Sequence, residues 1–118
     1  MLLMENVAEV LSSFSQRYTI RTYTPDPTSD KQILIIKGGG RQIKGLDGSV
    51  QYTTMQIQVL HKDKRTAEIS MENIINVLDG NTSIKGVEVC HWLGDTNYWT
   101  TDNGMHCFAS EFVLIYGR

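Results

Sequence analysis

The sequence has few of the features that mark exported, membrane-bound or nucleic-acid-binding proteins. It contains only two cysteines and no apolar run that approaches the roughly 20 residues needed to cross a bilayer. Its first residues include Glu5 and Glu9 and lack the basic segment of a signal peptide. Its formal net charge is -2, whereas nucleic-acid-binding domains usually carry a basic surface. We therefore expect free thiols, no membrane span, no export and no free-standing binding to nucleic acid.

The composition is that of an ordinary globular domain. Apolar residues make up 41% of the 118 residues and charged residues 20%. A chain of this length can bury roughly 65% of the surface that it exposes when unfolded, which is enough for one hydrophobic core. We expect a single domain that spans residues 1–118.

A strand followed by a helix, over Gln51–Leu78, gives the clearest local signal. From Gln51 to Leu60 apolar and polar residues alternate, which is typical of a half-buried strand. After a short turn, Asp63 is a plausible N-cap, or Thr66 if the helix begins later, and Gly80 suits the position after the helix. The helix between them has one apolar stripe, formed by Ala67, Met71, Ile74, Ile75 and Leu78.

The other expected elements are a helix over residues 1–15 and strands over residues 18–23, 32–37, 87–93 and 105–116. The order α-β-β-β-α-β-β predicts an α+β fold, with a mostly antiparallel β-sheet packed with two α-helices. The strands at 32–37 and 105–116 are apolar on both faces. One face of each would meet the helices, and the other would need a cover such as a neighbouring subunit.

A glycine-rich segment, residues 38–49, is expected to be a long loop between two strands. Five of its twelve residues are glycine. It lacks the spacing of a phosphate-binding loop, and a strand rather than a helix follows it, so we expect no nucleotide cofactor. Its length favours a mobile arm that orders against a partner, with Arg41 and Lys44 among its charges, although an idle loop is the alternative.

Two motifs that could hold chemistry have simpler interpretations. Cys90-His91 and His106-Cys107 would face each other in a hairpin of matching register, but neighbouring strand residues point to opposite faces and cannot converge on one metal ion. We expect core thiols and no metal site, with a cross-strand disulfide as the lesser alternative. His61, Asp63 and Ser70 have the residue types of a hydrolase without its motif, and Glu68 and Glu72 lie four apart on a solvated helix side. We expect no catalytic residue, and the protein is not expected to be an enzyme.

Exposed apolar and aromatic residues are candidates for contacts with other proteins. Ile69 projects from the side of its helix opposite the apolar stripe. Trp92, Tyr98 and Trp99 are expected in and around the last hairpin loop, where they would either anchor the loop or contact a partner.

The whole chain resembles the minor capsid and tail-terminator family of long-tailed bacteriophages. The resemblance lies in the order of elements and in four segments: Leu3–Leu11, Met55–Leu60, Lys62–Ala67 and a Phe-x-x-Glu-Phe-x-x-x-Tyr pattern at Phe108–Tyr116. It implies a structural protein that forms a homo-oligomeric, hexameric ring on the head-proximal end of the tail tube. Such a ring ends polymerisation of the tail tube protein and binds the neck or connector protein. It acts in the host cytoplasm during assembly and then in the virion, and DNA passes through its lumen without specific binding.

The resemblance carries no contact motif, so the interface residues rest on exposure alone. We expect Arg41 and Lys44 to contact the tube or the neck, and Ile69, Trp92 and Trp99 to contact other subunits. Glu88 and Asp95 are candidates for a lumen that repels DNA. The alternatives are a head-completion or neck protein of the same phage and, in a different class, a small ligand-binding α+β protein.

Overall fold

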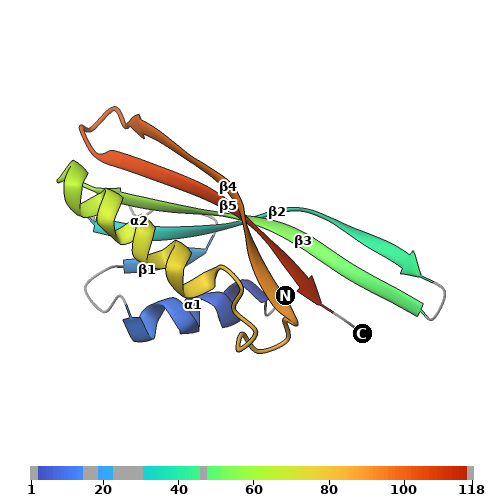
Figure 1. Cartoon of the computed structure of the whole chain (residues 1–118). Coiled ribbons are helices and arrows are strands. Elements are labelled where there is room, and N and C mark those ends of the chain that lie inside the picture. The colour runs from blue at the N-terminus through green and yellow to red at the C-terminus, as the bar shows by residue number, and fades with distance from the viewer. Residues whose placement is uncertain (1–2, 15–18, 23–30, 46–47, 117–118) are drawn as a thin grey trace.

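The computed structural model describes residues 3–14, 19–22, 31–45 and 48–116. They form two helices and one five-stranded sheet with strand order β1-β2-β3-β5-β4, and both helices lie against the same face of the sheet (Figure 1). This confirms the predicted α+β fold and element order. The elements are α1 (Leu3–Phe14), β1 (Thr19–Thr22), β2 (Lys31–Gly45), β3 (Gly48–His61), α2 (Lys64–Leu78), β4 (Val89–Thr100) and β5 (His106–Tyr116).

The sheet is antiparallel except at one edge. The short β1 pairs in parallel with the start of β2, from Gln32 to Ile35, whereas β2–β3, β3–β5 and β5–β4 are antiparallel pairs. The long final strand β5 therefore lies inside the sheet, between β3 and β4. It is hydrogen-bonded along both edges, so it is a central strand as its length and apolar composition predicted.

The main core lies between the sheet and the two helices. The alternating residues Met55, Ile57 and Val59 of β3 are fully buried there, as the period-2 pattern predicted. Helix α1 buries Met4, Val7 and Leu11 there at helical spacing. Of the apolar stripe predicted for α2, Ala67, Met71, Ile74 and Leu78 are buried and Ile75 is partly buried against them. Each large side chain buried in this way contributes about 1.5–3 kcal/mol to folding.

Both ends of α2 have the predicted capping residues. The backbone N–H of Thr66 donates to Asp63 Oδ2 at 2.9 Å, and Thr66 Oγ1 donates to the same carboxylate. These hydrogen bonds hold the pKa of Asp63 below its usual value. At the other end, Gly80 has a φ of 76°, which favours glycine after a helix.

The turn after α2 also covers part of the sheet edge. The N–H of Gly80 donates to the carbonyl of Cys90 at 2.7 Å, and the N–H of Cys90 donates to the carbonyl of Asn81 at 3.0 Å. Two residues further on, the N–H of Trp92 donates to Asp79 Oδ1 at 3.0 Å. The first part of β4 is thereby paired on its outer edge as well as with β5.

The glycine-rich segment is not the expected loop. Residues 31–45 and 48–61 form two paired strands, and residues 46–47 between them lie outside the described part. Gly40 pairs with Thr53 and Gly45 with Gly48, so the segment forms a two-stranded β-ribbon. Pairing of the backbone groups outweighs the low strand propensity of glycine, which is a weak and context-dependent preference.

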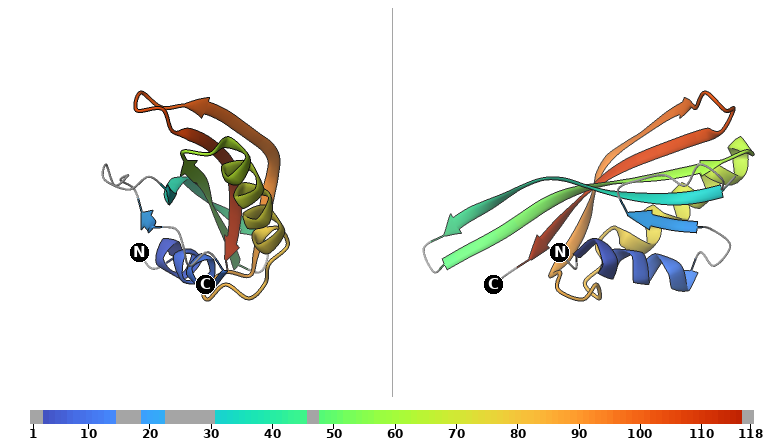
Figure 2. Two further views of the ribbon diagram at one scale, coloured as in Figure 1. Left: turned by 90° about the vertical axis from the view of Figure 1, so that its left-hand side faces the viewer. Right: turned by 180° about the vertical axis from the view of Figure 1, so that it is seen from behind.

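The β-ribbon, residues 40–45 and 48–53, gives the molecule its elongated shape. It extends away from the helices at one end of the molecule, whose extents are 50 × 24 × 23 Å (Figures 1 and 2). A register slip between Lys37 and Gly40 marks its base. At this slip Gly38 lies so close to Thr54 that any side chain would contact the Thr54 hydroxyl. Glycine is therefore favoured here, because any other residue would force the Thr54 side chain to shift.

The last hairpin is longer than predicted. The expected loop at residues 94–97 is part of β4, which runs to Thr100 with a bulge between Trp92 and Thr96. Gly94, inside the bulge, has a φ of 98°. The actual turn follows Thr100, and Thr101 N–H donates to the carbonyl of Met105 at 2.8 Å to close it. A glycine in a strand often marks a bulge rather than the end of the strand.

Candidate interaction surfaces

Four large apolar side chains are exposed in the described part of the structure. They are Leu93 at 53% exposure, Ile69 at 44%, and Tyr98 and Trp99 at 40% each. The sequence predicted the exposure of Ile69. Tyr98 and Trp99 lie in strand β4 rather than in a loop, and Leu93 was not singled out, because its exposure depends on the bulge that only the pairing with β5 shows.

Trp92, the third aromatic residue of that group, has a different environment. It is partly buried and packs against the main core, so the packing interpretation fits it better than an exposed contact. Its indole N–H is buried and has no hydrogen-bond partner among the described residues. The interface role predicted for Trp92 from exposure therefore has less support than the roles of Ile69 and Trp99.

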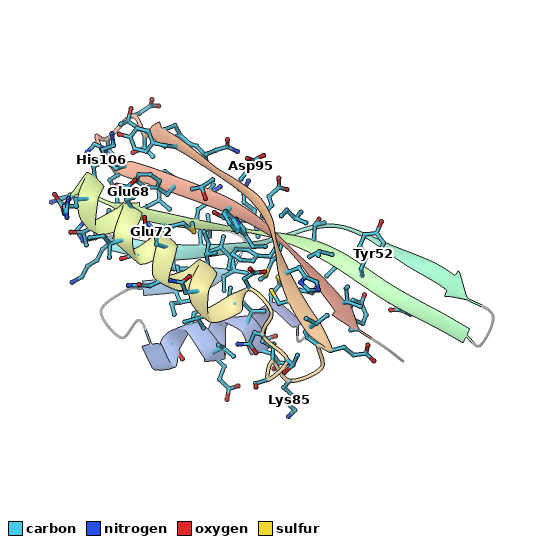
Figure 3. All side chains as sticks on the ribbon, in the orientation of Figure 1. Tyr52, Glu68, Glu72, Lys85, Asp95 and His106 are labelled. Atoms are coloured by element: carbon cyan, nitrogen blue, oxygen red, sulfur yellow. The ribbon has the colours of Figure 1, made fainter. Side chains whose placement is uncertain are left out.

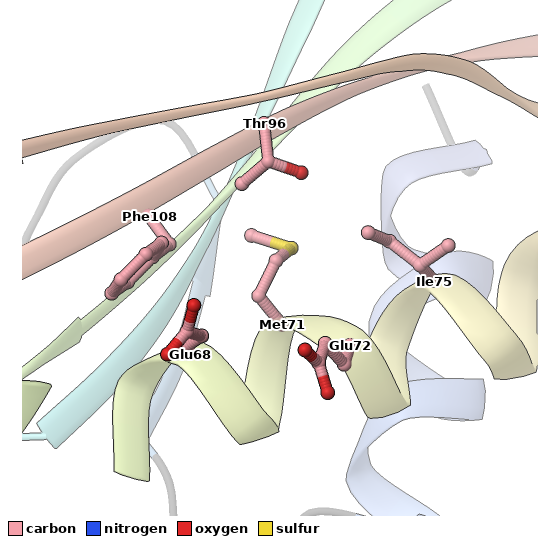
Figure 4. A pocket seen from close by; sticks show the side chains of 6 residues that line it. All are labelled: Glu68, Met71, Glu72, Ile75, Thr96 and Phe108. Atoms are coloured by element: carbon pink, nitrogen blue, oxygen red, sulfur yellow. The ribbon is translucent and has the colours of Figure 1, made fainter. Parts of the chain in front are cut away.

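A pocket lies between α2 and the hairpin of β4 and β5. It has a volume of about 200 Å³ and is lined by Glu68, Met71, Glu72, Ile75, Thr96 and Phe108 (Figure 4). Met71 and Phe108 are buried and make it apolar inside, whereas Glu68 and Glu72 are exposed. Thr96 comes from the end of the bulge, where its hydroxyl lies 2.8 Å from Ser110 Oγ.

The two carboxylates of this pocket have no ion-pair or hydrogen-bond partner within the described ranges 3–14, 19–22, 31–45 and 48–116. They lie four residues apart on one helix side, where like charges repel each other mildly. The sequence suggested that Glu68 and Glu72 are ordinary solvated residues. Their place at an apolar pocket requires the packing of Thr96 and Phe108 from distant strands, which the spacing on the helix does not reveal.

His61 and Asp63, which have the residue types of a hydrolase site, form hydrogen bonds at the start of α2, and neighbouring residues connect this turn to the last hairpin. The N–H of Asp63 donates to His61 Nδ1 at 2.9 Å, while the Asp63 carboxylate caps the helix. Tyr98 Oη lies 2.6 Å from His106 Nδ1, and Lys64 Nζ lies 4.6 Å from the centre of the Tyr98 ring. These contacts hold the first turn of α2 against the β4–β5 hairpin.

The two cysteines are free and lie apart, so a disulfide between them is excluded. Cys90 pairs with Leu114 and Cys107 with Trp99, which shows that the expected matching register was wrong. Cys90 belongs to the main core, and Cys107 to a smaller cluster with Leu34, Leu60 and Met105. Burial raises the pKa of each thiol to about 12. Among the described residues no group of three or more metal-ligating side chains is present.

The smaller cluster contains Leu34 of β2, Leu60 of β3 and Cys107 of β5, together with Met105 just before β5. Leu34 alternates with Ile33 and Ile35, and Cys107 precedes Phe108, so the cluster occupies the sheet face turned away from the helices. All four of its members are less than a tenth exposed. The prediction that β2 and β5 are apolar on both faces is thereby confirmed.

The basic residues predicted to contact a partner lie on the β-ribbon. Arg41 pairs with Tyr52 and Lys44 with Ser49, so both positions belong to β2 beyond the register slip. Their side chains are outside the described part of the structure. The pairing of β1 with β2 ends at Ile35 of β2. Beyond Ile35, no strand among the described residues pairs with the outer edge of β2. Neither described helix is long and apolar enough to cross a membrane.

Comparison with known proteins shows that this chain shares its fold with a solved structure, and it assigns the chain to no family. No protein-family model matches the sequence, and no curated protein matches it. A solved structure described as the virion of the native gene transfer agent particle contains a chain with the same fold. The two chains are 12% identical and superimpose with a TM-score of 0.76, over 98% of this chain and 95% of the other. At this identity the likeness shows a shared fold across nearly the full length of both chains.

Proposed function

We propose that this chain is a structural component of a phage-like virion rather than an enzyme. The observation that carries the proposal is the likeness of fold to a chain of the gene transfer agent virion, which covers nearly all of both chains. The resemblance of the sequence to the tail-terminator family, noted independently of the fold, points in the same direction. Fold alone never determines function, so the proposal rests on the likeness of fold and the resemblance of the sequence together.

Within such a particle the finer proposal is a tail terminator. Copies of the chain, folded as one domain over residues 1–118, form a hexameric ring on the head-proximal end of the tail tube. The ring ends polymerisation of the tube protein and joins the tube to the neck or connector protein. DNA passes through the lumen without specific binding, past carboxylates such as Glu88 and Asp95, which are both exposed. The protein acts in the host cytoplasm during assembly and then in the tail or neck of the virion.

The distribution of surface features supports a ring. The β-ribbon lies at one end of the molecule, and the pocket residues Glu68 and Glu72 lie towards the other, as does His106, on which the exposed Tyr98 stacks (Figure 3). A contact between two different surfaces of the same protein is heterologous, and heterologous contacts generate closed rings or open filaments. Ile69 and Trp99 are proposed to take part in contacts between subunits, because exposed apolar side chains of this size favour burial against a partner.

The two alternatives are less well supported. A head-completion or neck protein would use the same ring geometry with a different partner, and only the partner distinguishes it. A small ligand-binding protein would use the pocket between α2 and the hairpin, but its volume of about 200 Å³ is small. Pockets for drug-sized ligands usually have volumes of about 300–1,000 Å³.

The test combines oligomeric state with a capping assay. Size-exclusion chromatography with light scattering is expected to give the mass of six copies. Added to polymerising tube protein of the same particle, the protein should shorten the tubes and appear at one end of each in electron micrographs. A strict monomer at high concentration that leaves tube length unchanged would contradict the proposal, and a thermal shift with a metabolite would favour the ligand-binding alternative.

A further inference from the structure

Each edge of the sheet has a stretch of backbone that pairs with no strand in the part of the chain that the structure describes. On one side, the pairing of β1 ends at Ile35, so residues 36–45 of β2 are open at their outer edge. On the other side, the turn after α2 covers Cys90 and Trp92, so residues 93–100 of β4 are open. The two open stretches are similar in length, and backbone of this kind favours the addition of another strand.

The free backbone groups of β4 and β2 can be located from the hydrogen bonds beside them. The N–H of Thr101 donates to the carbonyl of Met105. Hydrogen-bonded pairs alternate along an antiparallel ladder, so Trp99 bonds to β5, whereas the N–H and C=O of Tyr98 point out of the sheet. Carried across β5 and β3 to β2, the same alternation turns the N–H and C=O of Lys37 out of the sheet as well.

The sheet face turned away from the helices is apolar at both open edges. Ile36 of β2 packs against the smaller cluster, and Cys107 of that cluster pairs with Trp99 of β4. Residues directly opposite each other on neighbouring strands share a face, so Ile36 and Trp99 lie on the same face at its two edges. Ile36 is partly buried and Trp99 is exposed. A strand added at either edge would cover the apolar side chain there.

A second copy of the chain is the partner that fits both edges. The open stretches lie on opposite edges of one sheet and towards opposite ends of the molecule, so they cannot pair within a copy (Figure 1). Three antiparallel steps separate β2 from β4, so β4 of a neighbour whose helices lie on the same face runs antiparallel to β2. Such neighbours are staggered along the strands, and stagger is compatible with closure because strands in closed sheets are tilted.

We propose that β4 of one copy adds to the open edge of β2 of the next copy as an antiparallel strand, with Tyr98 in a hydrogen-bonded pair with Lys37 and Trp99 opposite Ile36. This contact deepens the proposed ring and rests on it. Each copy offers both edges, so the contact is heterologous and repeats from copy to copy until the ring closes. β1 and the turn after α2 end the open stretches and thereby limit how far the two strands can slide.

Disulfide trapping tests the pairing. Cys107 is first replaced by alanine, because it lies opposite Trp99 in the same copy. In this background Ile36→Cys with Trp99→Cys should give, under mild oxidation, a ladder of linked copies up to the size of the ring, since directly opposite Cβ atoms suit a disulfide. Each single variant should stay unlinked. The matched control is Ile36→Cys with Thr100→Cys, whose second thiol points to the opposite face and should cross-link at least tenfold less.

Hydrogen exchange of the wild-type protein gives a second measurement that needs no substitution. In dissociated copies the amide of Tyr98 should exchange rapidly, because it points out of the sheet. In rings its exchange should be at least tenfold slower. The amide of Trp99 bonds to β5 and should be protected in both states, so it serves as an internal control.

Four results separate failure of this contact from failure of the proposed function. Cross-linking of the Trp99→Cys variant alone would overturn the contact, because it would show that two β4 strands pair with each other. Unchanged exchange at Tyr98 in rings that cap tubes refutes the contact while the proposed function stands. Protection of Tyr98 that appears only when tube protein is added also refutes it, and assigns the β4 edge to that protein. If the wild-type protein neither oligomerises nor caps tubes, both proposals fail.

Discussion

The base of the β-ribbon offers a sharp test of why a glycine stands at position 38. A Cβ atom added there would lie within contact distance of Thr54 Oγ1 and 3.2 Å from the Thr54 carbonyl oxygen. Overpacking of this kind costs about 1–3 kcal/mol. The backbone of Gly38 is outside the left-handed region, so alanine gains about 0.4–1 kcal/mol by restricting the unfolded chain. We expect Gly38→Ala to lower the free energy of unfolding by about 1–2 kcal/mol net.

Thr54→Ala provides the control, because it removes the hydroxyl and leaves only the tight contact with the carbonyl oxygen. The double variant Gly38→Ala with Thr54→Ala should therefore be more stable than the sum of the single effects by at least about 0.5 kcal/mol. Urea-induced unfolding followed by circular dichroism measures all three variants. Additive effects, or a Gly38→Ala variant as stable as the wild type, would show that the close approach of Thr54 is not the reason for glycine here.

Two further predictions concern ionisable groups. Burial raises the pKa of the Cys90 and Cys107 thiols to about 12, so they should resist alkylation at pH 8 in the folded protein and react rapidly in denaturant. Mass spectrometry measures the labelling, and fast labelling of the native state would contradict their burial. Hydrogen bonds from Thr66 lower the pKa of Asp63, so its ionised form should stabilise the protein above the unfolded pKa, about 3.9, and this contribution should disappear as pH falls through the folded pKa. Asp63→Asn should show a smaller loss of thermal stability in acid, and an unchanged loss would argue against the cap.

The elements that sequence reasoning located best are those in which local and tertiary preferences agree. Asp63 and Gly80 delimit α2 as predicted, because a capping side chain and a residue with positive φ act within one turn of the chain. The alternation of Met55, Ile57 and Val59 predicted the buried face of β3 for the same reason. Each of these signals needs only neighbours in sequence.

The errors arose where pairing between distant strands outweighs composition. The glycines of residues 38–49 suggested a loop, but β2 and β3 pair through them, and Gly94 suggested the end of a strand that in fact continues past a bulge. The turn of the last hairpin follows Thr100, so Cys107 pairs with Trp99, and Cys90 and Cys107 do not face each other. Neither a bulge nor a register can be read from propensities, because both depend on which backbone groups meet across strands.

The candidate site was predicted only in part. Exposure of Ile69 followed from helical spacing, since it lies opposite the apolar stripe of α2. The pocket was missed, because Glu68 and Glu72 look like a solvated helix side until Thr96 and Phe108 are brought beside them. The distinction between Trp92, which packs against the core, and Trp99, which is exposed, depends on their positions in β4 relative to the bulge.

The turn that follows α2 has a consequence for aggregation of the protein. An open strand edge is a template for uncontrolled growth into fibrils. Residues 80 and 81 pair with Cys90, and the N–H of Trp92 donates to the Asp79 carboxylate, so the first part of β4 is blocked from such growth. That stretch of the sheet edge is therefore protected from self-templated aggregation, whereas the outer edge of β2 beyond Ile35 pairs with no strand among the described residues.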